Sequence, residues 1–267
     1  MTMISTPGKS FDEIAQETLE PSPFSKLRKR IFGNYSFLAG LIIIMAIFAM
    51  ALLAPLIAPH DPGFQYRDSF LTPPFWEEGG KAAFLLGTDA VGRDILSRLI
   101  FGARFSLFIG LVVVTIALSG GIVMGLVAGY LRGPVDTLIM RVMDIILSFP
   151  SLLLALVLVA ILGPGLMNAL IAVAIVNIPF FARNVRGVTL VIARSDYIAA
   201  ARLSGRGTVS LLLFEVVPNL WSVIIVAFST TVGWMILETA GLSFLGLGAQ
   251  PPQADLGSML GEGRKIL

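Results

Sequence analysis

The sequence predicts an all-helical integral membrane protein. Of its 267 residues, 56% are hydrophobic and only 13% are charged, whereas soluble domains carry about 25% charged residues. The charged residues are also unevenly spread, so that several long intervals contain none. A soluble protein of this composition would leave much of its apolar surface in water, so we expect most of the chain to lie in lipid.

The composition also excludes several classes of protein and of site. The net charge of +2 is too small for a disordered chain, and the 27 glycines and 15 prolines follow no triplet period. The lack of cysteine excludes disulfides and zinc thiolate sites, and His60 is the only histidine. No phosphate-binding Gly-rich loop, nucleophile elbow or zinc-protease motif occurs. We therefore expect no catalytic residue, no cofactor and no metal bound by this chain itself.

Five apolar stretches are long enough to cross the hydrocarbon core, which needs about 20 residues per helix. The first covers residues 36–58, and the second runs from Phe105 to Leu131. The interval from Ile145 to Ala182 is too long for one helix, and Gly163–Gly165 splits it into an antiparallel pair. The fifth span covers residues 219–237, after Pro218 and Asn219 mark its start.

The spans divide the chain into four regions. A polar tail (residues 1–35) precedes the first span (residues 36–58), and a Pro- and Gly-rich connection (residues 59–104) leads to a helical core (residues 105–267). Most of the 19 lysines and arginines fall in the tail and in alternate connections. Because basic residues concentrate on the cytoplasmic side of inner membranes, the N-terminus is predicted to be cytoplasmic and the 59–104 connection periplasmic.

Glycines and prolines within the spans predict how the helices pack and bend. Gly121, Gly125 and Gly129 recur every four residues and leave one helix face almost bare. Such a stripe lets a second helix approach closely, and packing within the chain is favoured over homodimerisation. Pro150 and Pro179 are expected to kink their spans.

Residues 194–217 predict a helical hairpin in a cytoplasmic connection. Ser195 and Asp196 offer an N-cap for a short helix, which Gly205 ends, and residues 208–217 form a second, apolar segment. The same spacing occurs in DNA-binding helix-turn-helix units, but an apolar second helix pinned between membrane spans argues against nucleic acid as a partner. An inert connecting loop is the other alternative.

A few charged residues remain to be assigned. Asp144 is expected to pair with Arg141 three residues earlier, and Glu238, at the end of the fifth span, could face a pathway through the membrane. His60 is expected to be a loop residue rather than a metal ligand. Four residues leading into the second span are expected to form an ion-pair cluster that seats this segment on its neighbours: Arg93, Asp94, Arg98 and Arg104.

Four segments in order resemble the dipeptide/oligopeptide/nickel permease family of ABC importers, C-type subunit. They are LGTDAVGRDILSRLIFGARFSL (86–107), MRVMDIILSFPSLLLAL (140–156), DYIAAARLSGRGTVSLLLFEVVPN (196–219) and GLSFLGLGAQPP (241–252). The resemblance implies the transmembrane domain of a type I ABC importer, with five spans visible here and the family's sixth span apparently absent. Because the chain stops where that span should start, a truncated gene product or a natural variant is expected.

The resemblance also assigns roles to two groups of residues. The helical hairpin would be the coupling element that sits in a cleft of an ATPase subunit, through Asp196, Tyr197, Ala199, Ala200, Ala201, Arg202, Gly205 and Arg206. The periplasmic signature would comprise Gly87, Thr88, Asp89, Gly92, Arg93, Asp94, Ser97 and Arg98. The chain departs from the family at Ala199, where the coupling motif usually has glutamate, so a contact through that carboxylate is missing.

The function implied is the permease subunit of a bacterial ABC importer in the inner membrane. Its partners would be a second homologous permease, two ATPase subunits that bind ATP and Mg²⁺, a periplasmic solute-binding protein and the lipid bilayer. Short peptides are the first expectation for the solute, with nickel, glutathione or opine-like conjugates as alternatives. An ion-coupled secondary transporter would need charged sites at mid-membrane, and a scaffold or receptor would move no solute.

Overall fold

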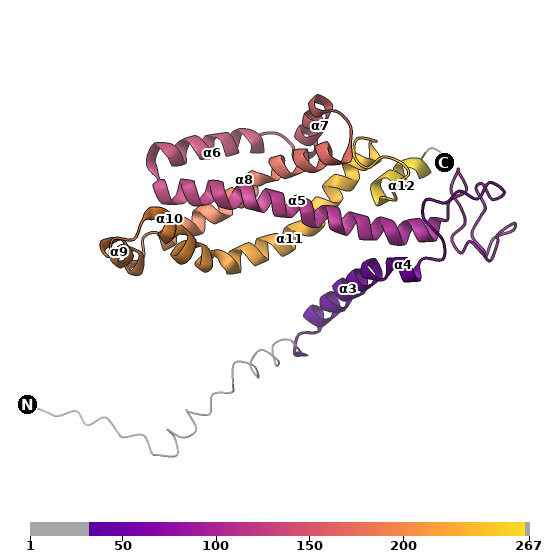
Figure 1. Cartoon of the computed structure of the whole chain (residues 1–267), viewed down its shortest axis with the longest axis horizontal. Coiled ribbons are helices and arrows are strands. Elements are labelled where there is room, and N and C mark those ends of the chain that lie inside the picture. The colour runs from indigo at the N-terminus through magenta and orange to yellow at the C-terminus, as the bar shows by residue number, and fades with distance from the viewer. Residues whose placement is uncertain (1–31, 265–267) are drawn as a thin grey trace, which may run out of the picture. The chain divides into compact units, whose positions relative to one another are not determined.

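The computed structural model describes residues 32–264, and these residues form helices joined by loops, with no β-strand among them (Figure 1). Within this part of the chain, residues 32–49 and residues 50–264 belong to two separate compact units. The predicted tail lies almost wholly outside the described residues. Most of an apolar helix, α3 (Tyr35–Leu52), belongs to the smaller unit, and Asn34 precedes it, with Oδ1 accepting a hydrogen bond from the Phe37 backbone N–H at 3.2 Å. The next helix, the short α4 (Ala54–Ile57), belongs to the larger unit.

The larger unit is built on three long helices, α5 (Ile95–Leu131), α8 (Leu166–Ile192) and α11 (Val217–Phe244). Their buried apolar side chains form one core, to which α7 and the hairpin also contribute. In Figure 1 α9 lies at one end of this bundle, whereas α12 (Leu256–Gly263) and the loops that follow α4 lie at the other. The long helices therefore connect two distant ends of the unit.

The glycine stripe of α5 packs against α8. A Cβ on Gly121 would lie 2.3 Å from Cβ of Phe181, and one on Gly125 would lie 2.6 Å from the carbonyl oxygen of Ala182. A Cβ on Gly129 would lie 2.8 Å from Cβ of Thr189. These distances are shorter than any real side-chain contact, so only glycine permits this approach of the two helices.

The kink expected at Pro150 is a sharp bend in the structure. The chain forms α6 (Gly133–Leu147) and α7 (Ser151–Leu162), bent by 93° at a break that ends in Pro150. The 12 residues of α7 reach about 18 Å, too short for a hydrocarbon core of about 30 Å. Among the described residues, four helices are long and apolar enough to cross a membrane, or five if the bent pair counts as one broken span.

The charges of α6 explain why it does not join the apolar stretch that follows. Asp144 pairs with Arg183 of α8 at 2.6 Å rather than with Arg141, and Asp136 accepts from Nη2 of Arg186 at 2.6 Å. These two ion pairs hold α6 along α8. The pairing partner predicted for Asp144 from spacing along one helix was therefore wrong, because a residue on another helix lies closer.

Two predicted helix boundaries also differ. The second span begins at Ile95, ten residues earlier than expected, because Asp94 caps α5 by accepting from the Ser97 N–H at 3.0 Å. The fifth span begins at Thr208, since α10 (Thr208–Leu211) continues through a π-helical segment, η1 (Leu212–Val216), into α11. Pro218 lacks an N–H and crowds the preceding turn, and the wider π-helical turn lets the helix pass it unbroken.

Candidate functional site

The helical hairpin comprises α9 (Asp196–Leu203), a turn through Gly205, and α10. Ile198 is fully buried in the common core, so this side chain anchors α9 to the bundle. On the open side, Ala199 and Ala200 are exposed, and the side chain of Leu203 is 91% exposed. The hairpin therefore presents small side chains with one projecting apolar residue.

Contacts to three helices hold the hairpin in place. The guanidinium of Arg202 lies over the Tyr130 ring of α5, 4.7 Å from its centroid, and Arg206 forms an ion pair with Glu215 of η1. Asn219 of α11 donates to the Tyr197 hydroxyl at 3.3 Å. Arg202 and Arg206, two of the residues that the resemblance assigns to ATPase coupling, are thus engaged within the chain.

The other predicted hairpin residues have varied surroundings. Asp196 is exposed in the first turn of α9, and Ala201 is partly buried against the core. Ser195 occupies the N-cap position, but its Oγ donates to the carbonyl oxygen of Ile192 at 2.6 Å rather than capping the helix. Gly205 has a φ of +80°, the left-handed conformation expected of a residue that ends a helix.

At the other end of the unit, the signature residues fold into tight turns before α5. Gly87 and Gly92 have φ values of +77° and +80°, and a Cβ on either would lie within 2.3 Å of a backbone carbonyl oxygen. The hydroxyl of Thr88 accepts from the Thr72 N–H at 2.9 Å and donates to the carbonyl oxygen of Ser69. The signature therefore determines the path of the chain into α5.

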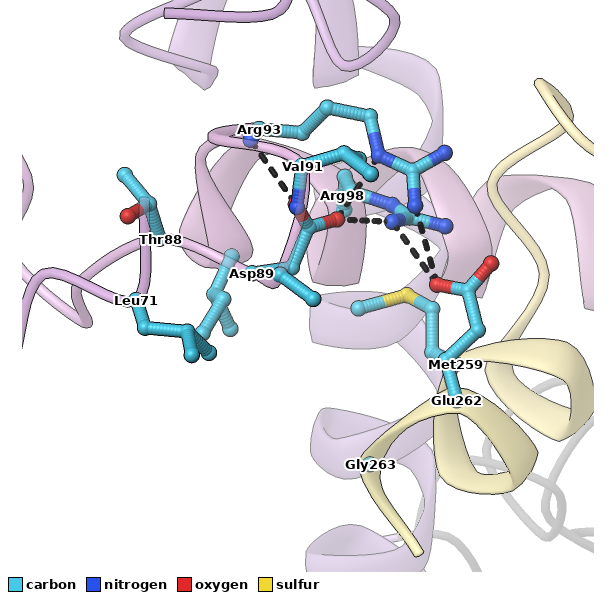
Figure 2. A pocket seen from close by; sticks show the side chains of 11 residues that line it. Leu71, Thr88, Asp89, Val91, Arg93, Arg98, Met259, Glu262 and Gly263 are labelled. Carbon is cyan, nitrogen blue, oxygen red and sulfur yellow. Dashed lines mark hydrogen bonds and ion pairs between the residues drawn. The ribbon is translucent and has the colours of Figure 1, made fainter. Parts of the chain in front are cut away.

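Four of the charged side chains at this end form a polar cluster, shown in Figure 2: Asp89, Arg93, Arg98 and Glu262. Arg93 Nε donates to Asp89 Oδ2 at 2.7 Å, and Arg98 also pairs with Asp89. Both arginines donate to Glu262 Oε2 at 3.0 Å. Because Arg93 and Arg98 are only 5% and 1% exposed, the two carboxylates provide their charge balance.

The polar cluster fastens α12 to the start of α5. It borders a cavity of about 530 Å³, which is also lined by apolar residues including Leu71 and Met259. Asp94 and Arg104, which were expected in the cluster, lie outside it. Asp94 caps α5 and faces Nδ1 of His60 at 3.4 Å, and Arg104 is exposed. Glu262 was missed because it is far from Arg98 in sequence and no local pattern marks it.

Stability of the polar cluster is expected to fall in acid. Burial raises the pKa of the Asp89 carboxyl. Hydrogen bonds from the Arg93 backbone and side chain and from the Val91 N–H together lower this pKa by more than burial raises it, so it lies below its ordinary value. The stabilisation is then complete above the unfolded pKa of about 3.9 and is lost as the pH falls through the lower folded pKa. The unfolding temperature, measured at several values between pH 6 and pH 3, reports this loss. In an Asp89→Asn variant the unfolding temperature should depend less on pH. If the variant and the wild type showed the same pH dependence, Asp89 would not be the group responsible.

Comparison with known proteins decides the family. Residues 121–264 match the family model described as binding-protein-dependent transport system inner membrane component. Residues 22–74 match the model described as the N-terminal TM domain of oligopeptide transport permease C. The chain belongs to this permease family. The predicted family and the all-helical membrane fold are thereby confirmed, and the permease is a multi-pass inner-membrane protein.

Curated relatives resemble the permease over most of its length. The di/tripeptide transport system permease protein of Pseudomonas aeruginosa is 49% identical over 92% of this chain and 82% of its own. The dipeptide permease protein of Haemophilus influenzae is 44% identical over 88% and 79%, and the glutathione permease protein of Pectobacterium atrosepticum is 39% identical over 91% and 79%. The inward-facing MetNI methionine ABC transporter, at 18% identity, covers 63% of the permease and 88% of its own chain with a TM-score of 0.47.

Proposed function

We propose that this permease moves dipeptides and short oligopeptides across the inner membrane, driven by ATP hydrolysis on partner subunits. The names of the most similar relatives support peptides ahead of glutathione. Family membership favours an ABC importer over an ion-coupled secondary transporter. The complete importer would contain a second homologous permease, two ATPase subunits that bind ATP and Mg²⁺, and a periplasmic solute-binding protein.

The observation that carries this proposal is the construction of the hairpin. Its open face is small enough to enter a cleft of an ATPase subunit, and its buried Ile198 joins it to the core. Only a short turn separates α8 from α9, and α10 continues into α11. A displacement of α9 would therefore move two long helices together, which is how force from the ATPase would alternate access between the two sides.

The proposal includes an orientation with the N-terminus in the cytoplasm. The hairpin then lies on the cytoplasmic side, within reach of the ATPase subunits, and the polar cluster lies on the periplasmic side. Figure 1 shows α9 and α12 at opposite ends of the bundle, as this orientation requires. The excess of lysine and arginine in the connections on the hairpin side also supports it.

Replacing Ala200 with tryptophan is expected to block docking of the ATPase subunit. The larger ring would project from the exposed face of α9 without entering the core, so the bundle should still fold. We expect about a tenfold or greater loss of ATPase co-purification and of ATP-dependent uptake of a labelled dipeptide into proteoliposomes.

The matched control is Ala82→Trp, an exposed alanine in the loops between α4 and α5, which should leave co-purification unchanged. Retention of the ATPase subunits by Ala200→Trp would contradict the docking role of α9. The solute proposal is tested in the same vesicles with the unaltered complex, by comparing uptake of dipeptide and glutathione in the presence of ATP or of an ion gradient alone. Uptake that needs only the gradient would overturn the proposed function.

A further inference from the structure

A carboxylate deep in the bundle is hydrogen bonded to neutral groups from three helices. Glu238 of α11 is only 6% exposed. Its Oε1 accepts from Ser151 Oγ of α7 at 2.6 Å and from Trp234 Nε1 at 3.1 Å, and its Oε2 accepts from Asn177 Nδ2 of α8 at 2.7 Å. No ion pair links Glu238 to a cation within residues 32–264. The Glu238 carboxylate is therefore held inside the bundle by neutral donors, and its expected place on a pathway through the membrane stays a prediction.

The partner on α7 is the only polar side chain of that helix. Residues 151–162 read SLLLALVLVAIL, so apolar side chains cover every face of α7 beyond Ser151. A uniformly apolar helix has no hydrophobic stripe to define which face turns toward the core, particularly when lipid surrounds the bundle. Ser151, Ala155 and Val159 follow one another at four-residue spacing, and the latter two are buried. The hydrogen bond to Glu238 thus marks the face of α7 that packs inward.

The break before α7 makes this contact more important. The first backbone N–H groups of α7 follow Pro150, and a carboxylate close to a helix N-terminus is electrostatically favourable. Gly241 of α11, one turn after Glu238, lies beside Leu152 of α7. A Cβ there would lie 3.6 Å from Leu152 Cδ1, an ordinary van der Waals contact, so the two helices are in direct contact at this point. Geometry and charge therefore both join the start of α7 to α11.

We propose that Glu238 is a positioning residue for transport, which keeps the broken α6–α7 span in register with α8 and α11. This inference rests on the proposed function, in which displacement of the hairpin moves α8 and α11. Glu238 would carry that movement to α7, whose apolar surface alone does not fix its rotation. Without the carboxylate, α8 and α11 would still move during ATP hydrolysis, but α7 would follow them poorly.

The test measures how much solute enters per ATP hydrolysed, using the complete complex in proteoliposomes. In Glu238→Gln an NH₂ group replaces Oε2 and faces the amide of Asn177, and Ser151→Ala removes the link to α7. Each variant is expected to lower the ratio of solute to ATP about tenfold, because a hydrogen bond to a charged group is lost. Combining them should lower it little further, since both break one network.

The matched control is Thr239→Val, which removes a buried hydroxyl that donates only to carbonyl oxygens of its own helix. It should keep the wild-type ratio. The fluorescence of Trp234, in a background with Trp76→Phe and Trp221→Phe, gives a second readout: Glu238→Gln should shift its emission, and Ser151→Ala should leave it nearly unchanged.

The proposal is overturned if Glu238→Gln and Ser151→Ala both retain the wild-type ratio, or if Thr239→Val lowers it equally. Should Glu238→Gln fail to assemble, Ser151→Ala decides alone, because it leaves Glu238 with two donors. Failure of the proposed function is distinguishable, since the unaltered complex would then show no ATP-dependent uptake at all.

Discussion

Replacing Asp89 with alanine is expected to destabilise the permease by about 3–5 kcal/mol, because it leaves two buried guanidinium groups with a single carboxylate. Asp89 accepts hydrogen bonds from both arginine side chains of the polar cluster and from the backbone N–H groups of Val91 and Arg93. Arg98 is the more sensitive partner. Its Nε and Nη2 are buried and already lack hydrogen-bond partners within the described part of the chain.

The loss is measured as the thermal unfolding temperature of the purified permease in detergent. Asp68→Ala is the control, since Asp68 is an exposed aspartate of the same loops, and it should change stability by less than about 0.5 kcal/mol. The double variant Asp89→Ala with Arg93→Met should recover part of the lost stability, because one buried arginine, Arg98, then remains to pair with the one remaining carboxylate, Glu262. Equal melting of Asp89→Ala and Asp68→Ala would show that the polar cluster does not hold α12 to α5.

The sequence predicted two members of the polar cluster, Arg93 and Arg98, and missed its two carboxylates, Asp89 and Glu262. Asp89, Arg93 and Arg98 lie within ten residues of one another, so their proximity follows from local structure. Glu262 reaches them only because α11 returns the chain to the same end of the bundle. Asp94 was expected among the ion pairs because of its charge. Its carboxylate instead accepts a hydrogen bond from the Ser97 backbone N–H, as is common for the residue just before a helix.

The positions of the long helices were predictable because length and lack of charge suffice to define a span. A kink at Pro150 was predicted but its size was not, because a proline in a span produces anything from a slight kink to the 93° bend between α6 and α7. The hairpin was found from Gly205 and the run of alanines. The continuity of α10 with α11 was missed because Pro218 was expected to begin a helix rather than to lie within one.

Replacing Gly121 with alanine is expected to destabilise the permease by about 2–3 kcal/mol, through separation of α5 from α8. The new Cβ would lie 2.3 Å from Phe181 Cβ and 3.0 Å from the Ala182 backbone nitrogen. Neither atom is the far end of a flexible side chain, so the helices themselves must move. This strain exceeds the gain of about 1 kcal/mol that alanine brings to a helix.

Gly120→Ala provides a control one residue away. Its Cβ would meet Cδ1 and Cγ1 of Ile178 at 3.0 and 3.1 Å, and both atoms belong to one side chain that can change rotamer, whereas Gly121 faces backbone and Cβ atoms. The helix propensity of alanine should then dominate, leaving Gly120→Ala as stable as the wild type or slightly more so. We expect the unfolding temperature of Gly121→Ala to lie about 5–10 °C below that of Gly120→Ala. Because the two variants have the same composition and adjoining positions, a difference of that sign can come only from the face of α5 that each alanine occupies. Equal unfolding temperatures would mean that the α5–α8 contact is looser than these distances require.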